Sequence, residues 1–281
     1  MPTAVLLLSC PDQPGVVHGV AEFVLGLQGN IVHAEQHIDV ESGVFFQRVE
    51  FDSAGLDAAS LAEAFAPVAD RFGMTVEARM VADRPRIALL ASTQPHCLTD
   101  LLARRQSGEL PAEVAVVVSN HGDHAGLAAF HGVPFRHLAV TPETRGAQEG
   151  ALLATLAEHQ VELVVLARYM QILGPAILDA YPARIINIHH SFLPAFVGAR
   201  PYHQAQQRGV KLIGATAHYA TAELDEGPII AQDVTAVSHR DSVGDMIRKG
   251  RDLETVVLAR AVRAHVEHRT LVYGNKTIVF G

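Results

Sequence analysis

The sequence predicts an α/β protein of two units, a β-α-β-β-α-β unit followed by a unit with a mainly parallel sheet. Its 281 residues suit two domains, because a domain commonly holds about 100–200 residues. The charge balance changes near residue 84: residues 1–83 carry 12 acidic and 3 basic side chains, and the remainder carries 18 acidic and 19 basic ones. The order of strand-like and helix-like patterns changes at the same point. We therefore expect a first domain over residues 1–82 and a second over residues 86–281, joined by a short linker.

Six elements are predicted in the first unit. An apolar run that ends at Ser9 indicates a buried strand, and a turn rich in proline, with Gly15 at its end, interrupts the chain after it. Apolar residues then recur at helical spacing up to Leu27, where a Gly-Asn pair provides a stop signal. The expected elements are strand 4–9, helix 16–27, strand 31–40, strand 44–51, helix 61–72 and strand 74–80. This order is the split β-α-β arrangement of ferredoxin-like sheets, with both helices on one face.

After the linker, strands alternate with helices, which is the pattern of a parallel sheet covered by helices. Short apolar runs mark the strands, and longer amphipathic stretches mark the helices. The expected strands are 87–91, 114–118, 135–140, 163–166, 185–188, 211–219 and 227–234. The expected helices are 98–105, 126–130, 148–159, 175–180 and 242–268, and a terminal hairpin is centred on Asn275.

The composition excludes several classes of protein. Apolar residues make up 49% and charged residues 19%, a profile typical of a globular protein with a core. No apolar run approaches the roughly 20 residues of a membrane span, and no basic stripe is present for binding nucleic acid. The two cysteines, Cys10 and Cys97, are too few and too far apart for a disulfide scaffold. We therefore expect a cytoplasmic protein with no membrane and no nucleic-acid partner.

Two short motifs of the first unit resemble those of ACT domains, which are small regulatory modules. Asp12-x-Pro14-Gly15 follows the first strand, and Gly29-Asn30-Ile31 follows the first helix. The simpler interpretation is a tight turn that caps a helix, with Gly15 providing backbone freedom. The element order favours the ACT-like interpretation. The resemblance implies an amino-acid effector, a homo-oligomer (dimer or tetramer), and a ligand loop at Asp12, Pro14, Gly15 and Asn30.

The densest set of polar residues follows a predicted strand, at Ile186–Pro194, where open α/β sheets place their ligands. Alternation along the strand puts Asn187 and His189 on one side of it. His218 lies in a later strand-like run, and Asp225 lies in the loop after that run. An amide and an imidazole can stabilise an oxyanion, while a carboxylate can orient or deprotonate a nucleophile. If they converge, these residues are the parts of an acyl-transfer site.

These residues carry a resemblance to the folate-dependent formyltransferase family. The matching motifs are Asn187-Ile188-His189, Ser191-x-Leu193-Pro194-x-Phe196-x-Gly198, and Leu224-Asp225-x-Gly227 after His218. The resemblance implies a Rossmann-like formyltransferase domain, catalytic roles for Asn187, His189 and Asp225, and a supporting role for His218. The segment 166–173 resembles the family's folate-binding loop, in which members often carry Arg at the position of Gln171. Folate-binding roles are implied for Tyr169, Met170, Gln171, Ile172, Leu173 and Leu193.

The loop over residues 91–98 indicates which members of the formyltransferase family the sequence resembles. In glycinamide ribonucleotide formyltransferases the matching loop is rich in small residues, and its backbone amides hold the phosphate of the amine acceptor. Here the loop has no glycine, and Pro95 has no N–H. The strings His189–Phe196 and Asp225–Ile230 are similar to those of family members that hydrolyse 10-formyltetrahydrofolate, a folate substrate, with water as acceptor. The resemblance implies this hydrolase activity, with formate and tetrahydrofolate as products, no cofactor, and a role in one-carbon and purine metabolism.

Three alternatives remain open on the sequence alone. The first is formyl transfer to an amine acceptor, such as glycinamide ribonucleotide. In the sequence, only the absence of a phosphate-binding loop distinguishes a hydrolase from such a transferase. A sensor that binds folate without turnover would not need all three catalytic side chains. A zinc hydrolase could take its ligands from the histidines and Asp225, but no HExxH or paired-cysteine spacing is present and no metal is expected. The histidines considered for it are His189, His190, His203 and His218.

Further histidine and cysteine positions favour structural roles. The cluster His121-Gly122-Asp123-His124 favours a strand-end turn over a metal site. His190 is expected on the opposite side of the strand from His189, where it either donates a hydrogen bond to a residue of the site or only packs against its neighbours. Cys97 favours a small buried residue over a nucleophile, because no adjacent base is evident.

Overall fold

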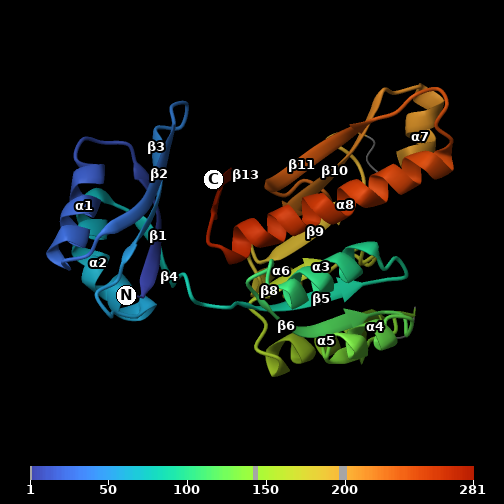
Figure 1. Cartoon of the computed structure of the whole chain (residues 1–281), viewed down its shortest axis with the longest axis horizontal. Coiled ribbons are helices and arrows are strands. Elements are labelled where there is room, and N and C mark those ends of the chain that lie inside the picture. The colour runs from blue at the N-terminus through green and yellow to red at the C-terminus, as the bar shows by residue number, and fades with distance from the viewer. Residues whose placement is uncertain (1, 142–144, 196–200) are drawn as a thin grey trace. The chain divides into compact units, whose positions relative to one another are not determined.

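The computed structural model describes residues 2–141, 145–195 and 201–281 (Figure 1). Contacts between residues divide the chain into two compact units. The first contains the residues up to Asp83 together with Glu267–Leu271 and Ile278–Gly281, and the second contains Arg84–Val266 with Val272–Thr277. Positions 196 and 198 of the formyltransferase signature lie outside the described residues.

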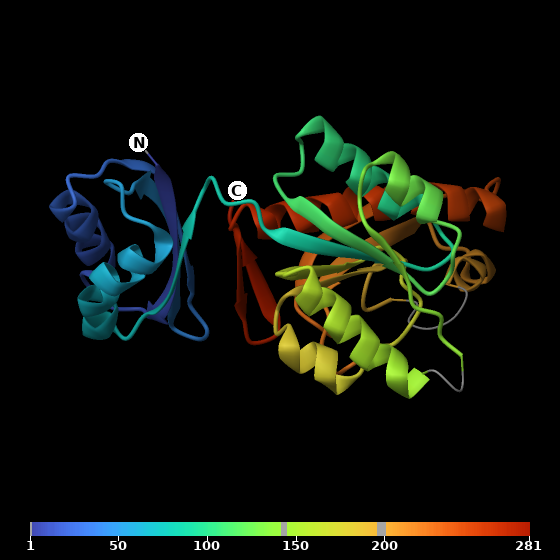
Figure 2. The same cartoon turned by 90° about the horizontal axis from the view of Figure 1, so that it is seen from below.

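The first unit is an antiparallel four-stranded sheet with two helices on one face (Figures 1 and 2). Its elements are β1 (Thr3–Pro11), α1 (Val16–Gly26), β2 (Ile31–Asp39), β3 (Val44–Asp52), α2 (Ala58–Phe72) and β4 (Thr75–Met80). The strand order β2-β3-β1-β4 is that of a ferredoxin-like sheet, which confirms this part of the predicted fold class. Leu61, Phe65 and Phe72 share one face of α2, and they pack with Phe51 of β3 in the core of this unit.

The second unit is a seven-stranded sheet with helices on both faces (Figure 2). Its elements are β5 (Arg86–Ala91), α3 (His96–Ser107), β6 (Glu113–Ser119), α4 (Ala125–Phe130), β7 (Phe135–His137), α5 (Arg145–Glu158), β8 (Leu163–Leu166), α6 (Pro175–Ala180), β9 (Ile185–His189), α7 (Pro201–Arg208), β10 (Leu212–Tyr219), β11 (Ile229–Ala236) and α8 (Val243–Val266). Strands β9, β8, β5, β6 and β7 are parallel neighbours in this order, and β10 and β11 extend the sheet antiparallel beyond β9. This mainly parallel sheet confirms the second part of the fold class.

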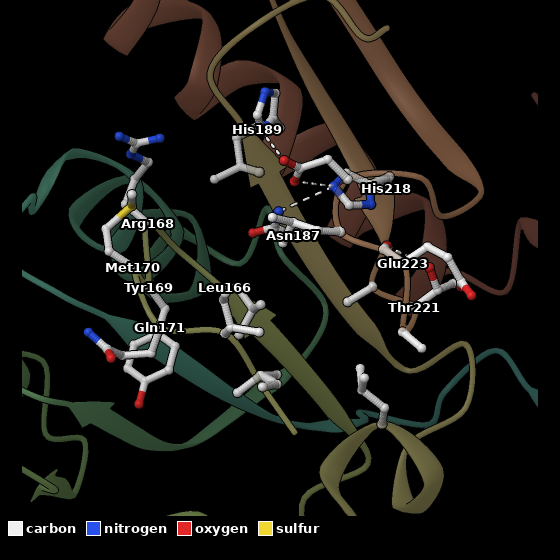
Figure 3. A pocket seen from close by; sticks show the side chains of 18 of the residues that line it. Leu166, Arg168, Tyr169, Met170, Gln171, Asn187, His189, His218, Thr221 and Glu223 are labelled. Atoms are coloured by element: carbon white, nitrogen blue, oxygen red, sulfur yellow. Dashed lines mark hydrogen bonds and ion pairs between the residues drawn. The ribbon is translucent and has the colours of Figure 1, made fainter. Parts of the chain in front are cut away.

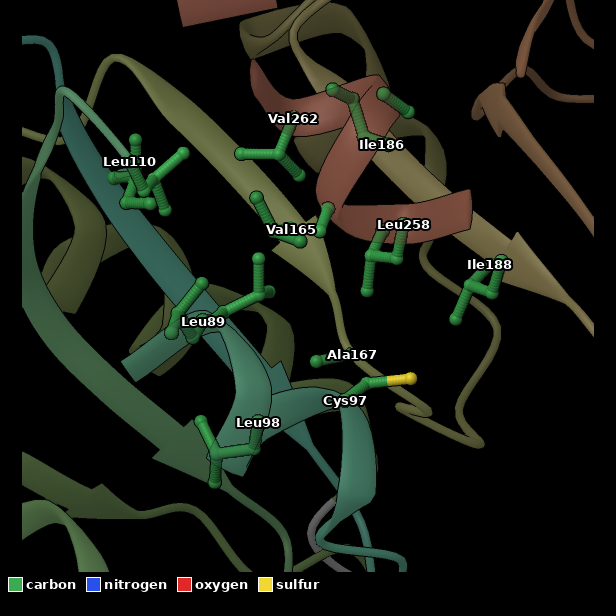
Figure 4. Close-up of a cluster of buried hydrophobic side chains, with 14 of the residues drawn as sticks. Leu89, Cys97, Leu98, Leu110, Val165, Ala167, Ile186, Ile188, Leu258 and Val262 are labelled. Atoms are coloured by element: carbon green, nitrogen blue, oxygen red, sulfur yellow. The ribbon is translucent and has the colours of Figure 1, made fainter. Parts of the chain in front are cut away.

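Apolar side chains cover both faces of this sheet. On one face, Leu89, Val165 and Ile186 of the strands pack against Leu98 of α3 and Leu258 of α8 (Figure 4). On the other face, the strands pack against α5 and α6. Burial on both faces explains why the central strands are continuous apolar runs rather than alternating patterns. The sheet is thus a packed support that presents the carboxyl ends of β8 and β9 at one edge.

Two elements of the second unit differ from the sequence-based expectation. The strand expected over residues 135–140 ends at His137, because its neighbour β6 ends at Ser119 and leaves the next residues without a strand partner. The sequence predicts no helix at α7, yet one is present. Tyr202 and Ala205 are the buried apolar side chains of α7, and two such positions are too few to show a helical period.

The end of the chain also departs from the expected division. The terminal hairpin, β12 (Thr270–Tyr273) and β13 (Lys276–Val279), is present as predicted around Asn275. Its flanking segments, however, group with the first unit rather than with the second. Arg48 of β3 is 6% exposed, and its Nε donates to the carbonyl oxygen of His268 at 2.9 Å. A buried guanidinium needs such an acceptor, so part of the C-terminal region completes the first unit.

Candidate active site

A cavity of about 480 Å³ opens at the carboxyl ends of β8 and β9 (Figure 3). Its walls come from the loop after β8, from the end of β9 and from the loop after β10. Figure 3 shows Asn187, His189 and His218 on one wall, across from the loop that carries Arg168, Met170 and Gln171. Open α/β sheets bind ligands at this edge, where the loops that follow the strands meet.

The four residues predicted to carry the chemistry lie together on this wall. Strands β9 and β10 pair with Asn187 directly opposite His218, and Asn187 Nδ2 donates to His218 Nε2 at 3.2 Å. The Asp225 carboxylate lies between two imidazoles. Its Oδ2 is 3.3 Å from His189 Nδ1, and its Oδ1 is 3.7 Å from His218 Nε2. Strand pairing and one loop therefore bring the amide, the imidazoles and the carboxylate into contact.

The loop that carries Asp225 lies directly against β10. A side chain at Gly227 would place its Cβ 1.8 Å from the carbonyl oxygen of Tyr219, so only glycine allows this approach. Asp225 itself has a left-handed backbone, with φ of 60°. Aspartate and asparagine tolerate that conformation better than most residues do. The Asp-x-Gly spacing seen in the sequence is thus what turns the carboxylate toward the two histidines.

Asp225 is held as a carboxylate. Hydrogen bonds from His189 and then from His218 lower the pKa of Asp225 well below the ordinary range of aspartate, and they outweigh the partial burial that would raise it. His218 Nδ1 lies 3.0 Å from the carbonyl oxygen of Tyr219, so this nitrogen carries a proton. In the neutral ring, Nε2 then has a lone pair for the Asn187 amide; in the protonated ring, Nε2 donates to Asp225.

This wall can stabilise an oxyanion and activate a water molecule. His189 is buried, and its Nε2 has no hydrogen-bond partner among the described residues. A substrate carbonyl oxygen bound beside the ring would supply that partner, with the Asn187 amide as a second donor. The Asp225 anion next to them can orient and deprotonate a nucleophile. Acyl transfer is therefore the chemistry that the geometry favours.

The loop over residues 168–173 forms the wall across the cavity from these groups. Met170 and Ile172 leave 59% and 70% of their surface exposed, and they offer apolar contacts to a flat ligand. Gln171 and Leu173 also line the cavity. Tyr169 is buried, because it packs in the core beneath the loop and its hydroxyl accepts a hydrogen bond from a glutamine of α5. The loop therefore combines a buried anchor with exposed apolar side chains.

Some predicted site residues lie elsewhere. Leu193 is buried and is not among the residues that line the cavity. In the first unit, Asp12, Pro14 and Gly15 precede α1, and Asn30 follows its other end. The 11 residues of α1 span about 16 Å, so these four residues do not form one cluster within a single chain.

Comparison with known proteins places this geometry in a family. The model of the formyl transferase family matches residues 85–262. A formyltetrahydrofolate deformylase of Synechocystis sp. is 55% identical over 280 residues, which cover 99% of this chain and 98% of the relative. The chain belongs to the formyltetrahydrofolate deformylase family. A crystal structure of a deformylase from Pseudomonas syringae pv. tomato matches with a TM-score of 0.97 at 49% identity, over 100% of this chain and 95% of that chain.

The deformylase family shares part of its fold with the transformylases. A crystal structure of glycinamide ribonucleotide transformylase 1 from Symbiobacterium toebii matches with a TM-score of 0.66 and 37% identity. That match covers 70% of this chain and 95% of the transformylase. The deformylase structure matches both units of this chain, whereas the transformylase structure matches only 70% of it.

A second polar cluster lies beside the cavity, and the sequence analysis missed it. Glu254 of α8 is 2% exposed. Its carboxylate has three partners: His96 Nε2 at 2.8 Å, Tyr202 Oη at 3.0 Å and Arg168 Nε at 3.3 Å. Gly250 makes room for this contact, because a Cβ there would lie 1.9 Å from the Tyr202 hydroxyl. The available signal was an acidic residue in the apolar stripe of α8, where a carboxylate needs partners.

This cluster does not fit a metal ion. Within the described part of the chain, His96, Cys97 and Glu254 have their ligand atoms within 4.8 Å of one another. The guanidinium of Arg168 already contacts the Glu254 carboxylate, and burial raises the pKa of the Cys97 thiol. A metal would have to displace a cation and deprotonate a buried thiol. The ligands considered for a zinc hydrolase form no comparable group among the described residues.

Ser92, which follows β5, holds the loop over residues 168–173 in place. Its hydroxyl donates to Asn120 Oδ1 at 2.7 Å and accepts from the backbone N–H of Met170 at 2.9 Å. Its own backbone N–H donates to the carbonyl oxygen of Arg168 at 3.2 Å, and the ring of His124 makes a short hydrogen bond with its carbonyl oxygen. His124 therefore supports a strand-end turn, which is the role that the sequence favours for its cluster.

We expect Ser92→Ala to raise the KM for a folate substrate several-fold with a smaller change in kcat. The substitution leaves the partly buried Met170 N–H without its acceptor, and a fully buried unsatisfied group would typically cost about 1–3 kcal/mol, the upper bound for this contact. Steady-state kinetics and urea unfolding measure the two effects. Ser107→Ala is the matched control, because the Ser107 hydroxyl donates to an exposed helix carbonyl far from the loop. An unchanged KM in the Ser92 variant would contradict the role of this contact.

We expect His190 to make the stability of the second unit depend on pH. Burial, followed by the charges of Arg168 and His189, lowers the pKa of His190 from 6.5 to about 4. Its contribution to stability is complete above the unfolded pKa and is lost as the pH falls toward 4, because only the unfolded chain takes up the proton. We expect His190→Gln to flatten the dependence of Tm on pH between 7 and 4. His137→Gln, at an exposed histidine, should keep the wild-type slope, and an equal slope in all three proteins would contradict this prediction.

Proposed function

We propose that this chain hydrolyses 10-formyltetrahydrofolate to formate and tetrahydrofolate. The observation that carries the proposal is the Asp225 carboxylate, held between His189 and His218 at the edge of a cavity of about 480 Å³. Membership of the deformylase family names the substrate class. The apolar loop around Met170 and Ile172 suits the flat pteridine of a folate.

In the proposed mechanism, the formyl oxygen lies against Asn187 and His189. Asp225 holds a water molecule and accepts its proton as the water oxygen bonds to the formyl carbon. The tetrahedral oxyanion is stabilised by the Asn187 amide and by protonated His189. When the bond from carbon to N10 breaks, His189 Nε2 gives its proton to N10, while His189 Nδ1 keeps its proton toward Asp225. Tetrahydrofolate and formic acid are released, and the acid loses its proton to water to become formate. Asp225 then gives its proton to solvent, and His189 Nε2 takes up a proton from solvent, which restores the starting state.

Formyl transfer to an amine is the second candidate, favoured by the match to a glycinamide ribonucleotide transformylase. The loop after β5 favours hydrolysis over formyl transfer. Pro95 stands at the start of α3 and has no N–H for an acceptor phosphate, and no side chain caps that helix. Water therefore takes the place of the amine in our proposal, and 10-formyltetrahydrofolate is a substrate rather than a cofactor.

The two parts of the chain are proposed to have separate functions. We assign regulation to residues 1–82, as an ACT-like domain that binds an amino-acid effector and joins copies of the chain in a homo-oligomer. Catalysis is assigned to the second unit, which comprises the expected domain from residue 86 without the C-terminal segments that group with the first unit, in the cytoplasm and within one-carbon and purine metabolism. Of the helices in the described residues, none has the length and apolar character to cross a membrane.

The test is turnover of 10-formyltetrahydrofolate by chelator-treated protein without any amine. Formate and tetrahydrofolate are quantified together, and the assay is repeated with glycinamide ribonucleotide. We expect equal amounts of both products, unchanged by chelation and by the amine. Formyl transfer that occurs only with the amine would replace the proposal with the second candidate. Loss of turnover on chelation, restored by zinc, would replace it with a zinc hydrolase.

A further inference from the structure

A second cavity, of about 210 Å³, lies next to the candidate active site. Glu254 and its partners His96, Tyr202 and Arg168 line it, together with Arg251. Arg168 and His190 are common to the walls of both cavities. The catalytic scheme above makes no use of this space.

The second cavity has an excess of positive charge. Arg168 and Arg251 bring two guanidinium groups, and Glu254 brings one carboxylate. Burial raises the pKa of Glu254, but the hydrogen bond from His96 and the charge of Arg168 outweigh burial and lower the pKa overall. Arg251 donates at 2.7 Å to the side-chain oxygen of Gln94, which is neutral. One positive charge at the cavity is therefore not balanced by these groups.

Polar atoms around this cavity also lack partners. His96 Nδ1, Arg168 Nε and His190 Nδ1 are buried and have no hydrogen-bond partner among the described residues. Arg168 Nε is 3.3 Å from Glu254, within ion-pair distance but without hydrogen-bond geometry. Buried polar groups nearly always have a partner, and a polar ligand in this cavity would supply one to all three atoms. Arg168 also has a left-handed backbone, with φ of 65°, a cost that proteins typically retain at functional sites.

We propose that the second cavity binds formate, with Arg168 as its main ligand. A carboxylate matches the planar fork of a guanidinium, and formate is small enough for a cavity of about 210 Å³. The inference rests on the proposed function, which generates formate in the adjoining cavity. There the Asp225 carboxylate repels the product anion, while Arg168 and Arg251 attract it. Formate therefore leaves the reacting centre toward the second cavity, past Arg168, which lines both cavities.

The test is direct binding of ¹³C-formate to the full chain without folate, followed by NMR line broadening in a buffer free of other carboxylates. The variants are Arg168→Gln, Arg168→Lys and Arg251→Gln. Arg136→Gln is the matched control, because it removes an exposed guanidinium paired with Glu158. Loss of a charge-assisted hydrogen bond should weaken formate binding about tenfold or more in Arg168→Gln and less in the other two cavity variants. The control should bind formate as the wild type does.

Three outcomes would overturn the formate site: no binding by the wild type, equal binding by the Arg168→Gln variant, or the same loss in the Arg136→Gln control. Circular dichroism checks that each variant is folded. If the Arg168→Gln variant does not fold, the milder Arg168→Lys and Arg251→Gln variants are compared with the wild type instead. None of these results depends on turnover. A chain that binds formate through Arg168 but releases none from 10-formyltetrahydrofolate would overturn the proposed function instead.

Discussion

Asp225→Asn is expected to lower the turnover of 10-formyltetrahydrofolate by about 10²–10⁴-fold, the range typical for loss of general acid–base catalysis. Asparagine has the same size as aspartate and tolerates the left-handed backbone at this position, where φ is 60°. The change therefore removes the negative charge that His189 and His218 stabilise without forcing the loop to move. Formate release at saturating substrate measures the effect, and circular dichroism checks the fold.

A matched control for this variant lies on β11. Asp233 is also an aspartate with a lowered pKa, chiefly because of the backbone N–H of Val234, and it pairs with Arg260. Asp233 does not line the cavity, so Asp233→Asn should keep wild-type turnover. Near-normal turnover in Asp225→Asn would remove Asp225 from the mechanism.

His189→Ala is expected to lower turnover by about 10²–10³-fold, the loss typical for one oxyanion donor. The same change should alter the pH profile of the residual activity. The hydrogen bond from His189 is the largest cause of the low pKa of Asp225, so the pKa of that carboxyl rises when the imidazole is absent. Protonation then inactivates the carboxylate at a higher pH, and the acid limb of kcat/KM moves upward.

The pH profile separates a role in the chemistry from a role in folding. His137→Ala removes an exposed histidine and should leave both the rate and the acid limb unchanged. A His189→Ala variant that loses activity while its acid limb stays in place would contradict the coupling of His189 to Asp225. Normal turnover in that variant would exclude His189 from the proposed scheme.

One part of the candidate site, the shared face of Asn187 and His189, could be predicted because its cause is local. The convergence of His218 and Asp225 on it was implied only by the resemblance to the formyltransferase family. Alternation along β9 places Asn187 and His189 on one face, and the adjacent strand brings His218 opposite Asn187. Asp225 reaches them through a loop whose spacing to Gly227 is written in the sequence. The strands of the central sheet were predictable for the same reason, because burial on both faces makes each a continuous apolar run.

What could not be predicted depends on contacts between distant segments. Arg168, Tyr202 and Glu254 meet only when the loop after β8, helix α7 and helix α8 pack together. No sequence period links such positions. The short helix α7 also has too few apolar residues to be predicted from their spacing. Leu193 belongs to a matching motif, yet it is buried and does not line the cavity.

The grouping of the last residues with the first unit has a consequence for dissecting the protein. A fragment cut after Asp83 would lack the His268 carbonyl and would leave the buried Nε of Arg48 without its acceptor. Among the described residues, only the Glu50 carboxylate, 3.0 Å from Nη2, would remain as a partner of this guanidinium. Neither unit is therefore a contiguous stretch of chain that a single cleavage would release intact. Studies of the N-terminal unit on its own need a permuted gene in which Glu267–Gly281 is spliced ahead of β1 or behind β4.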